Sequence, residues 1–357
     1  MKTYQSRFRP EIDALAGYQP GEQPRMTNLI KLNTNENPYP PSPRVAETLR
    51  DFDSAALRRY SDPDSTALRA AIAERWGVGP ERVIAGNGSD DILTMVFRGF
   101  TAPDRPFACP DPTYSLYPVL AAMQGAPVIR VPLERPGFML PADFADRVQE
   151  ANLVALARPN APTGNTFPLA AVRDLCERFA GAVLIDEAYA DFADDNCAAL
   201  LAEYPNLIIS RTFSKSYSLA GMRLGYAVSS PEIITGLFKL KDSYNLDAVT
   251  QAVGLAAYRD QAYLRENVRR IRAERDRVSA ALAELGFEVN PSAANFLFAA
   301  PPDRNGEAYF RYLRNAAVIV RHFPGAVTGA YVRITIGKPA DMDRLLELTR
   351  TYLATLP

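Results

Sequence analysis

Short apolar runs alternate with helix-forming segments through the first two thirds of the chain. We predict strands over residues 82–85, 105–109, 128–131, 152–157, 182–185, 207–209 and 226–228, and helices over 44–51, 65–76, 92–100 and 169–180. This alternation predicts an α/β fold whose sheet is mostly parallel and is covered by helices on both faces. Ligands of such sheets bind beyond the carboxyl ends of the strands, so the residues that follow each strand are the candidates for function.

The stretch 210–226, which follows the predicted strand at 207–209, holds the densest group of candidates. Four hydroxyl side chains surround Lys215: Ser210, Thr212, Ser214 and Ser216. Arg223 follows Lys215 by eight residues. A lysine that can form a Schiff base, next to hydroxyls and an arginine, suits a phosphate with a reactive carbon beside it. A lone Ser-Lys pair is more often a solvated loop, so the prediction rests on the whole stretch.

Four other predicted strands end in side chains that could bind or react with a ligand. These residues are Ser89, Tyr114, Asn160 and Asp186. Ser89 follows the turn Gly86-Asn-Gly88, and a glycine-rich turn before a helix offers free amides to an anion. Each residue alone has an ordinary structural explanation, such as loop chemistry, core packing or a solvated acid. Because all four are expected to lie at the same edge of the sheet as Lys215, together they favour a ligand site.

The composition excludes several kinds of partner. A net charge of -1 gives no basic field for nucleic acid, and no apolar run approaches the roughly 20 residues of a membrane span. The first ten residues are polar and lack the apolar core of a signal peptide. Three widely spaced cysteines, Cys109, Cys176 and Cys197, favour a reducing compartment over a disulfide framework. We therefore expect a cytoplasmic protein without nucleic-acid or membrane partners.

A single histidine, His322, limits the catalytic chemistry that the side chains alone could perform. Without a second histidine no His-rich metal site can form, and no metal is expected. A Ser-His-Asp or Cys-His centre would have to use His322, whose neighbours give no sign of one. We expect His322 to be a partly exposed loop residue, and a cofactor to carry any difficult chemistry.

The chain divides into an N-terminal arm (1–44), a large domain (45–265) and a smaller C-terminal α/β domain (266–357). Prolines within 31–43 exclude a helix there, so after one short helix the arm must run extended. It would lie either on this chain's own body or on a partner subunit. In the C-terminal domain we predict strands over 287–289, 295–299, 318–321 and 331–336, and helices over 263–285, 307–315 and from about residue 340.

Pyridoxal 5'-phosphate (PLP) would give these residues chemical roles. Lys215 would bind the aldehyde as an imine and, once released, would move a proton from the substrate Cα to the cofactor C4'. Asp186 would face the pyridine nitrogen and keep it protonated. Tyr189 lies three residues after Asp186 and can reach the phenolic oxygen O3'. Tyr114 can stack on the ring face opposite Lys215.

The phosphate end of PLP would bind where the strand ends offer amides, hydroxyls and a guanidinium. The residues predicted to bind this end are Gly88, Ser89, Asp90, Thr212, Ser214 and Arg223.

Several motifs resemble those of one enzyme family over nearly the whole chain. They are Tyr18-Gln-Pro-Gly21, Lys31-Leu-Asn-Thr-Asn-Glu-Asn-Pro38, Arg59-Tyr-Ser-Asp62, Gly88-Ser-Asp90, Pro112-Thr-Tyr114, Asp186-Glu-Ala-Tyr189, Thr212-Phe-Ser-Lys215, Leu219-Ala-Gly-Met-Arg223 and Arg333-Ile-Thr-Ile-Gly337. With these motifs the chain resembles the fold-type-I, class-II PLP-dependent aminotransferases and, among them, the histidinol-phosphate aminotransferases. The motifs around Lys215 and Arg223 are highly specific for the superfamily, and the terminal motifs are moderately specific for the subfamily.

The resemblance implies a large domain with a seven-stranded-type sheet, a smaller C-terminal domain, and a homodimer with shared active sites. Tyr60 would reach the PLP phosphate of the neighbouring subunit. Tyr18, Asn35, Arg321 and Arg333 would bind the anionic end of the substrate. The implied reaction, part of histidine biosynthesis, converts L-histidinol phosphate and 2-oxoglutarate into imidazole-acetol phosphate and L-glutamate.

One turn departs from the family pattern. The related enzymes usually carry an asparagine directly before Pro-Thr-Gly, where it contacts O3' of the cofactor. This chain has Ala161 at that position and Asn160 one residue earlier. Either the turn shifts to present Asn160 to the cofactor, or Tyr189 holds O3' with less help.

Three other functions stay open at this point. An aminotransferase of aromatic amino acids could use the same scaffold, with a substrate that ends in a carboxylate. A PLP-dependent decarboxylase of a phosphorylated amino acid would release carbon dioxide without needing a keto acid. A non-catalytic PLP-binding regulator would need a DNA-binding module, and nothing basic or helix-turn-helix-like precedes residue 30.

Overall fold

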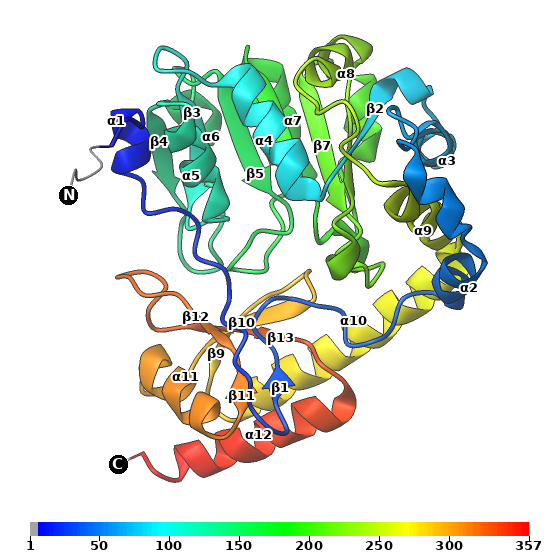
Figure 1. Ribbon diagram of the computed structural model, residues 1–357. Helices are drawn as coiled ribbons and strands as arrows, with labels where there is room; N and C mark the ends of the chain where they lie inside the picture. Colours follow the sequence, from blue (N-terminus) through cyan, green and yellow to red (C-terminus); the bar gives the residue numbers. More distant parts are fainter. Residues whose placement is uncertain (1–5, 357) are drawn as a thin grey trace, which may run out of the picture.

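Seven strands build the central sheet of the protein (Figure 1). The computed structural model describes residues 6–356. The strands are β2 (Val83–Gly86), β3 (Phe107–Asp111), β4 (Val128–Pro132), β5 (Leu153–Ala157), β6 (Ala182–Asp186), β7 (Leu207–Thr212) and β8 (Gly225–Val228). Their order is β2-β8-β7-β6-β5-β3-β4. In this sheet β8 runs antiparallel to both neighbours and every other pair is parallel, which confirms the predicted fold class.

Helices cover both faces of the central sheet. Every residue of β5 and β6 is buried, so these strands show no alternation of polar and apolar side chains. Successive residues of β5 enter two different hydrophobic clusters, Val154 and Leu156 in one, Leu153 and Ala155 in the other. The first cluster includes α2 (Pro43–Asp51), α3 (Thr66–Trp76), α6 (Phe144–Arg147), α7 (Leu169–Arg178) and α9 (Ala248–Arg259). The second includes α4 (Ser89–Phe100), α5 (Leu116–Met123) and α8 (Pro231–Phe238).

The parallel strands end at the edge of the sheet that faces the C-terminal part of the protein (Figure 1). That part contains a four-stranded antiparallel sheet in the order β12-β13-β10-β9. Its strands are β9 (Glu288–Asn290), β10 (Phe296–Ala300), β12 (Arg321–His322) and β13 (Val332–Thr335). A third hydrophobic cluster joins this sheet to α10 (Gln261–Glu284), α11 (Gly306–Asn315) and α12 (Pro339–Leu353). The domain boundary expected between residues 265 and 266 therefore falls inside α10.

The predicted single strand over 318–321 is wrong. The chain changes partners here: β11 (Val318–Ile319) pairs in parallel with β1 (Ile30–Lys31), while β12 pairs with β13. The reason is that the N-terminal arm, whose pairing could not be predicted, occupies the first two residues. The arm therefore lies on this chain's own C-terminal part, one of the two surfaces considered. Its short helix, α1 (Pro10–Asp13), lies beside α5 (Figure 1).

Several smaller expectations can be compared with the structure. The three cysteines are buried and free. His322 is half-buried in β12 instead of lying in a loop, and its Nε2 atom is 2.9 Å from the Gly329 carbonyl oxygen. Within residues 6–356 no helix is long and apolar enough to cross a membrane.

A buried ion pair ties β7 to the segment that follows β6. Arg211 donates from Nε to the Glu187 carboxylate at 2.9 Å, and its Nη2 atom lies 2.6 Å from the same group. The Arg211 Nη1 atom donates to Asp191 at 2.8 Å. The Glu187 side chain is fully buried, so without Arg211 its charge would remain in the core uncompensated. The pair holds in place the two strand ends that carry Asp186 and Lys215.

We predict that Arg211→Met destabilises the cofactor-free protein by about 3–5 kcal/mol, because it leaves Glu187 buried without its partner. The double variant Arg211→Met/Glu187→Met should recover most of the loss, since it removes both charges from the core. Urea unfolding of the three proteins measures this. Arg173→Met, which breaks the exposed pair between Arg173 and Glu203, is the control and should change little. A double variant as unstable as Arg211→Met would contradict the assignment.

Candidate active site

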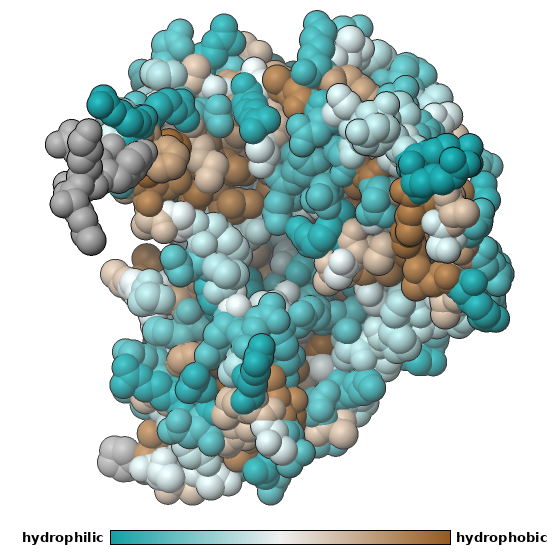
Figure 2. Space-filling model, in the orientation of Figure 1, coloured by the Kyte–Doolittle hydropathy of each residue, from teal (hydrophilic) through white to brown (hydrophobic). Residues whose placement is uncertain are grey.

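A cavity of about 240 Å³ lies between the carboxyl edge of the central sheet and the C-terminal part. The molecular surface is hollowed where these two parts meet (Figure 2). Most of the residues predicted for the site line this cavity: Tyr18, Asn35, Ser89, Asp90, Tyr114, Asp186, Tyr189, Thr212, Ser214, Lys215, Arg223, Arg321 and Arg333. The arm, the central sheet and the small sheet thus each contribute side chains to one cavity.

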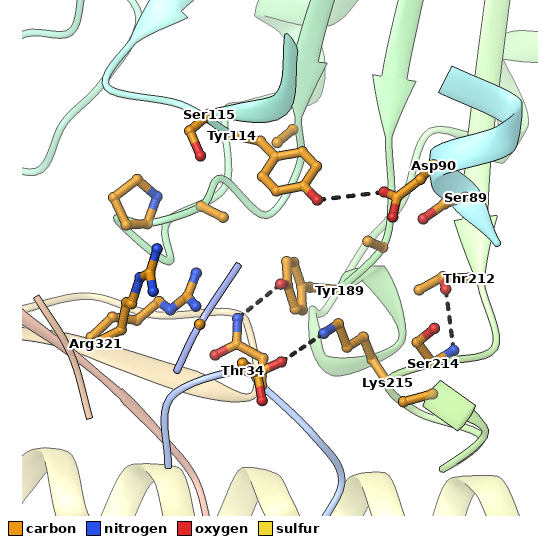
Figure 3. A pocket seen from close by; sticks show the side chains of 18 of the residues that line it. Thr34, Ser89, Asp90, Tyr114, Ser115, Tyr189, Thr212, Ser214, Lys215 and Arg321 are labelled. Carbon is orange, nitrogen blue, oxygen red and sulfur yellow. Dashed lines mark hydrogen bonds between the residues drawn. The ribbon is translucent and has the colours of Figure 1, made fainter. Parts of the chain in front are cut away.

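Lys215 follows β7 and reaches into the cavity (Figure 3). Its Nζ atom donates to the carbonyl oxygen of Thr34, in the arm, at 2.9 Å. Burial, and then the nearby Arg333 guanidinium, lower the pKa of Lys215 to about 8. A substantial share of the amine is therefore uncharged in weakly alkaline solution, which is the form that can act as a nucleophile or accept a proton.

Asp186 is the last residue of β6 and is buried. The Tyr117 hydroxyl donates to its carboxylate at 2.9 Å, and the Ala188 N–H donates at 3.2 Å. Burial raises the pKa of Asp186 to about 6, although these hydrogen bonds act in the opposite direction. Within the described part of the chain the carboxylate thus has hydrogen-bond donors but no cationic partner. A protonated ring nitrogen in the cavity would supply one.

Sequence reasoning missed Tyr117. This fully buried tyrosine lies in the apolar helix α5, where it looks like core packing. Two signals could have identified it. Its hydroxyl needs a partner when the ring is buried, and Tyr117 comes three residues after Tyr114, so the two can face the same region.

The first turn of α4 forms one end of the cavity. Gly88 has φ +87°, and a Cβ atom there would lie 2.6 Å from a nitrogen of Arg223, so only glycine lets the guanidinium approach. Arg223 also lies 3.2 Å from Asp90. Thr212 and Ser214 approach from β7, with the Ser214 N–H donating to Thr212 Oγ1 at 3.1 Å (Figure 3). Helix amides, hydroxyls and a guanidinium together suit a phosphate group.

Two tyrosines form the wall beside this end. The Tyr114 hydroxyl lies 3.4 Å from Asp90 Oδ1. Tyr18 comes from the arm and packs edge-on against the Tyr114 ring, with the ring centroids 6.0 Å apart. Tyr18 is still 40% exposed, so the arm covers the cavity without sealing it.

Two arginines form the opposite end. Arg321 in β12 and Arg333 in β13 are direct cross-strand partners, so their side chains lie on the same face of the small sheet. Both guanidinium groups lie over the Phe323 ring, at 5.6 and 5.2 Å from its centroid. Among the described residues the buried Nε atom of Arg333 has no hydrogen-bond partner. Two adjacent guanidinium groups, one of them with an unused donor, suit a second anion.

Three predicted residues do not line the cavity. Gly88 lies behind it, against Arg223. Asn160 is buried, and its side chain bonds instead to Thr113, Pro112 and Thr163, while Ala161 lines the wall. The turn therefore does not present Asn160 to the cavity, which leaves the other alternative, contact through Tyr189. Tyr60 is 82% exposed on the outer surface and stacks on Tyr244.

Comparisons with known proteins assign the family. Residues 27–348 match the family described as aminotransferase class I and II, so the chain is a member of that family of enzymes. Within it, the chain belongs with the histidinol-phosphate aminotransferases. The enzyme of that name from Acetobacter pasteurianus is 45% identical over 98% of this chain and 99% of its own length. The one from Geotalea daltonii is 44% identical over 95% and 97%.

Solved structures agree with this assignment. A crystal structure of histidinol-phosphate aminotransferase from Sinorhizobium meliloti, in complex with pyridoxal-5'-phosphate, has a TM-score of 0.88 to this chain. It is 26% identical and covers 98% of this chain and 99% of its own. The expected fold type and enzyme class are therefore confirmed.

We predict that the buried carboxylate of Asp186 costs the cofactor-free protein stability at neutral pH. Because the pKa is about 6 in the folded protein and 3.8 ordinarily, the folded state binds more protons between these values. Stability should therefore fall as the pH rises from about 4 to 6, by about 3 kcal/mol relative to Asp186→Asn. Urea unfolding across this range measures the difference. The exposed Asp104→Asn is the control, and a pH-independent difference for Asp186→Asn would refute the prediction.

Proposed function

We propose that this chain binds PLP and transfers the amino group of L-histidinol phosphate to 2-oxoglutarate, giving imidazole-acetol phosphate and L-glutamate in histidine biosynthesis. The observation that carries the proposal is the placement of Lys215 and Asp186 in one cavity that has an anion receptor at each end. The relatives named histidinol-phosphate aminotransferase support the choice of substrate.

The residues of the cavity fit PLP. When bound, PLP supplies an aldehyde carbon and a protonated pyridine ring that draws electrons from the substrate Cα. Asp186 would hold the proton on the pyridine nitrogen, since its buried carboxylate forms no ion pair with any residue from 6 to 356. The α4 end, with Ser89, Ser214 and Arg223, would hold the phosphate. Tyr114 would cover a face of the ring.

Lys215 would do the proton transfer. Its amine, with a pKa of about 8, can take the proton from the substrate Cα and deliver it to the C4' atom of the cofactor. Tyr189 would contact the phenolic oxygen of PLP. The wall formed by Tyr18 and Tyr114, which covers the cavity without sealing it, would limit the access of water during this transfer.

Arg321 and Arg333 would select the substrate by its anionic end. Guanidinium groups bind phosphate and carboxylate with the same fork geometry, so one receptor can serve histidinol phosphate and then 2-oxoglutarate. Tyr18 and Asn35 also line the cavity and would complete this receptor. An aromatic amino acid would bring a carboxylate instead of a phosphate, which makes the phosphate the discriminating group.

We predict that purified yellow enzyme, mixed with L-histidinol phosphate and no keto acid, loses its visible absorption quickly, and that 2-oxoglutarate restores it. L-Histidinol, which lacks the phosphate, should react about 10–200-fold less efficiently, the range expected for losing hydrogen bonds to a charged group. Arg333→Met should reduce this preference, since the variant lacks the discriminating guanidinium. Bleaching by phenylalanine but not by histidinol phosphate would instead establish an aromatic aminotransferase.

We also propose a homodimer in which Tyr60 binds the PLP phosphate of the partner subunit. Tyr60 lies outside its own chain's cavity, is 82% exposed, and is held by a stacked contact to Tyr244 at 4.3 Å. An exposed, ordered tyrosine of this kind suits an interface.

We predict that Lys215→Ala and Tyr60→Ala chains complement each other when they are unfolded and refolded together. In a hybrid dimer one site takes Lys215 from one chain and Tyr60 from the other, so it is intact. A random mixture should then reach about a quarter of wild-type activity, because half the dimers are hybrid and each has one intact site. Each variant refolded alone is the control. If Tyr60 serves its own chain's site, mixing will restore nothing.

A further inference from the structure

A chain of hydrogen bonds joins the arm, the small sheet and Tyr189. The backbone N–H of Asn35 donates to Thr335 Oγ1 at 3.0 Å, and the Thr335 hydroxyl donates to Asn35 Oδ1, also at 3.0 Å. The Asn35 Nδ2 atom then donates to the Tyr189 hydroxyl oxygen at 2.8 Å (dashed in Figure 3). Asn35 and Thr335 are both almost fully buried, so water does not compete for these bonds.

The partners in this chain favour one direction for its hydrogen bonds, because a flipped Asn35 amide would take away the acceptor of the buried Thr335 proton. The backbone N–H of Asn35 can only donate, so it occupies one acceptor site of the Thr335 oxygen, and among the described residues Asn35 Oδ1 is the acceptor bonded to the single Thr335 proton. This fixes the orientation of the Asn35 side-chain amide, with its NH₂ group toward Tyr189. The Tyr189 oxygen therefore accepts, and its own proton must point elsewhere.

The backbone of Asn35 is held firmly enough to maintain this arrangement. Its φ of +56° lies in the left-handed region, which asparagine tolerates better than most residues. Asn295 donates from Nδ2 to the Asn35 carbonyl oxygen at 3.0 Å. The segment is thus bonded both to β13 and to the residue that precedes β10.

The wall around Tyr189 leaves the cavity as the place for its proton. Ala161, Ala294 and Phe296 form an apolar cluster against Tyr189, and the Asn160 amide is used by other partners. Where related enzymes carry an asparagine donor, this chain therefore has a methyl group. Among the described residues of this wall, Tyr189 is therefore the side chain that can donate to a ligand oxygen.

We propose that Thr335 and Asn35 are positioning residues that direct the Tyr189 hydroxyl proton into the cavity, where it is donated to the phenolic oxygen of PLP. The inference rests on the proposed use of PLP. The charged groups that face Tyr189 are Arg333 from β13, Asp186 from β6, Asp90 from α4 and Lys215 from the end of β7. Burial raises the pKa of Tyr189, so the hydroxyl keeps its proton at neutral pH.

The measurable consequence is the pH at which bound PLP changes its visible absorption. A hydrogen-bond donor to the phenolic oxygen would stabilise the negative charge of that oxygen. The oxygen would then hold less tightly the proton that it shares with the nitrogen joining Lys215 to PLP. Removing the donor should raise this pH midpoint. An upward shift of about one pH unit corresponds to a tenfold smaller acid dissociation constant of bound PLP, which is within the range for losing one hydrogen bond to a charged group.

The experiment is a pH titration of the absorption of holoenzyme variants. Thr335→Val has nearly the same shape but lacks the hydroxyl, so the amide of Asn35 can turn over, and the midpoint should rise by about one unit. Thr335→Ser keeps the hydroxyl and should restore the wild-type midpoint. Asn35→Asp provides a second, independent variant: a carboxylate would accept the Tyr189 proton and draw it out of the cavity, which should also raise the midpoint.

Two further variants separate the possible outcomes. Thr349→Val removes another buried threonine hydroxyl that is bonded to a tyrosine, Tyr309, and should leave the midpoint unchanged. Tyr189→Phe should shift the midpoint fully, and adding Thr335→Val to it should shift it no further. An unchanged midpoint in both Thr335→Val and Asn35→Asp would overturn the positioning role of Thr335 and Asn35, but not the proposed binding of PLP. An unchanged midpoint in Tyr189→Phe would refute the proposed contact between Tyr189 and PLP.

Discussion

The cavity is organised around ionisable groups that the protein leaves without partners of opposite charge. Asp186, Lys215 and Arg333 form no ion pair with any residue between 6 and 356, and each bonds instead to neutral hydroxyl, amide or carbonyl groups. Burial of an unpaired charge disfavours the charged form, which explains why the pKa of Asp186 is raised and that of Lys215 is lowered. A cofactor with a pyridine nitrogen and an aldehyde, bound together with a substrate that has an anionic end, would provide a partner for each of the three groups.

Two sheets with different topologies supply the two ends of this cavity. The parallel strands of the central sheet end at one edge and place Asp186 and Lys215 there. The antiparallel small sheet contributes Arg321 and Arg333, which its register places opposite each other. Neither sheet alone supplies both ends of the cavity, so the cavity depends on the packing of the C-terminal part against the central sheet.

The sequence predicts those features that depend on local pattern. Asp186 and Lys215 could be found because each follows an apolar strand, and parallel topology brings such positions together. Tyr117 and Thr335 were missed, because each looks ordinary within its own element and its hydrogen-bond partner is 69 or 300 residues away. The strand predicted over 318–321 failed for the same reason, since the arm that pairs with β11 comes from the other end of the chain.

The arm connects these observations. The carbonyl oxygen of Asn33 accepts from Arg333, and that of Thr34 accepts from Lys215, both at 2.9 Å. Two consecutive carbonyls thus accept one hydrogen bond each from the cations at the two sides of the cavity. The next residue, Asn35, orients Tyr189. Moving this segment would leave both cations without these acceptors, which disfavours an open arm. The pairing of β1 with β11 therefore does more than anchor the terminus, because it fixes the segment that determines the polarity of the cavity.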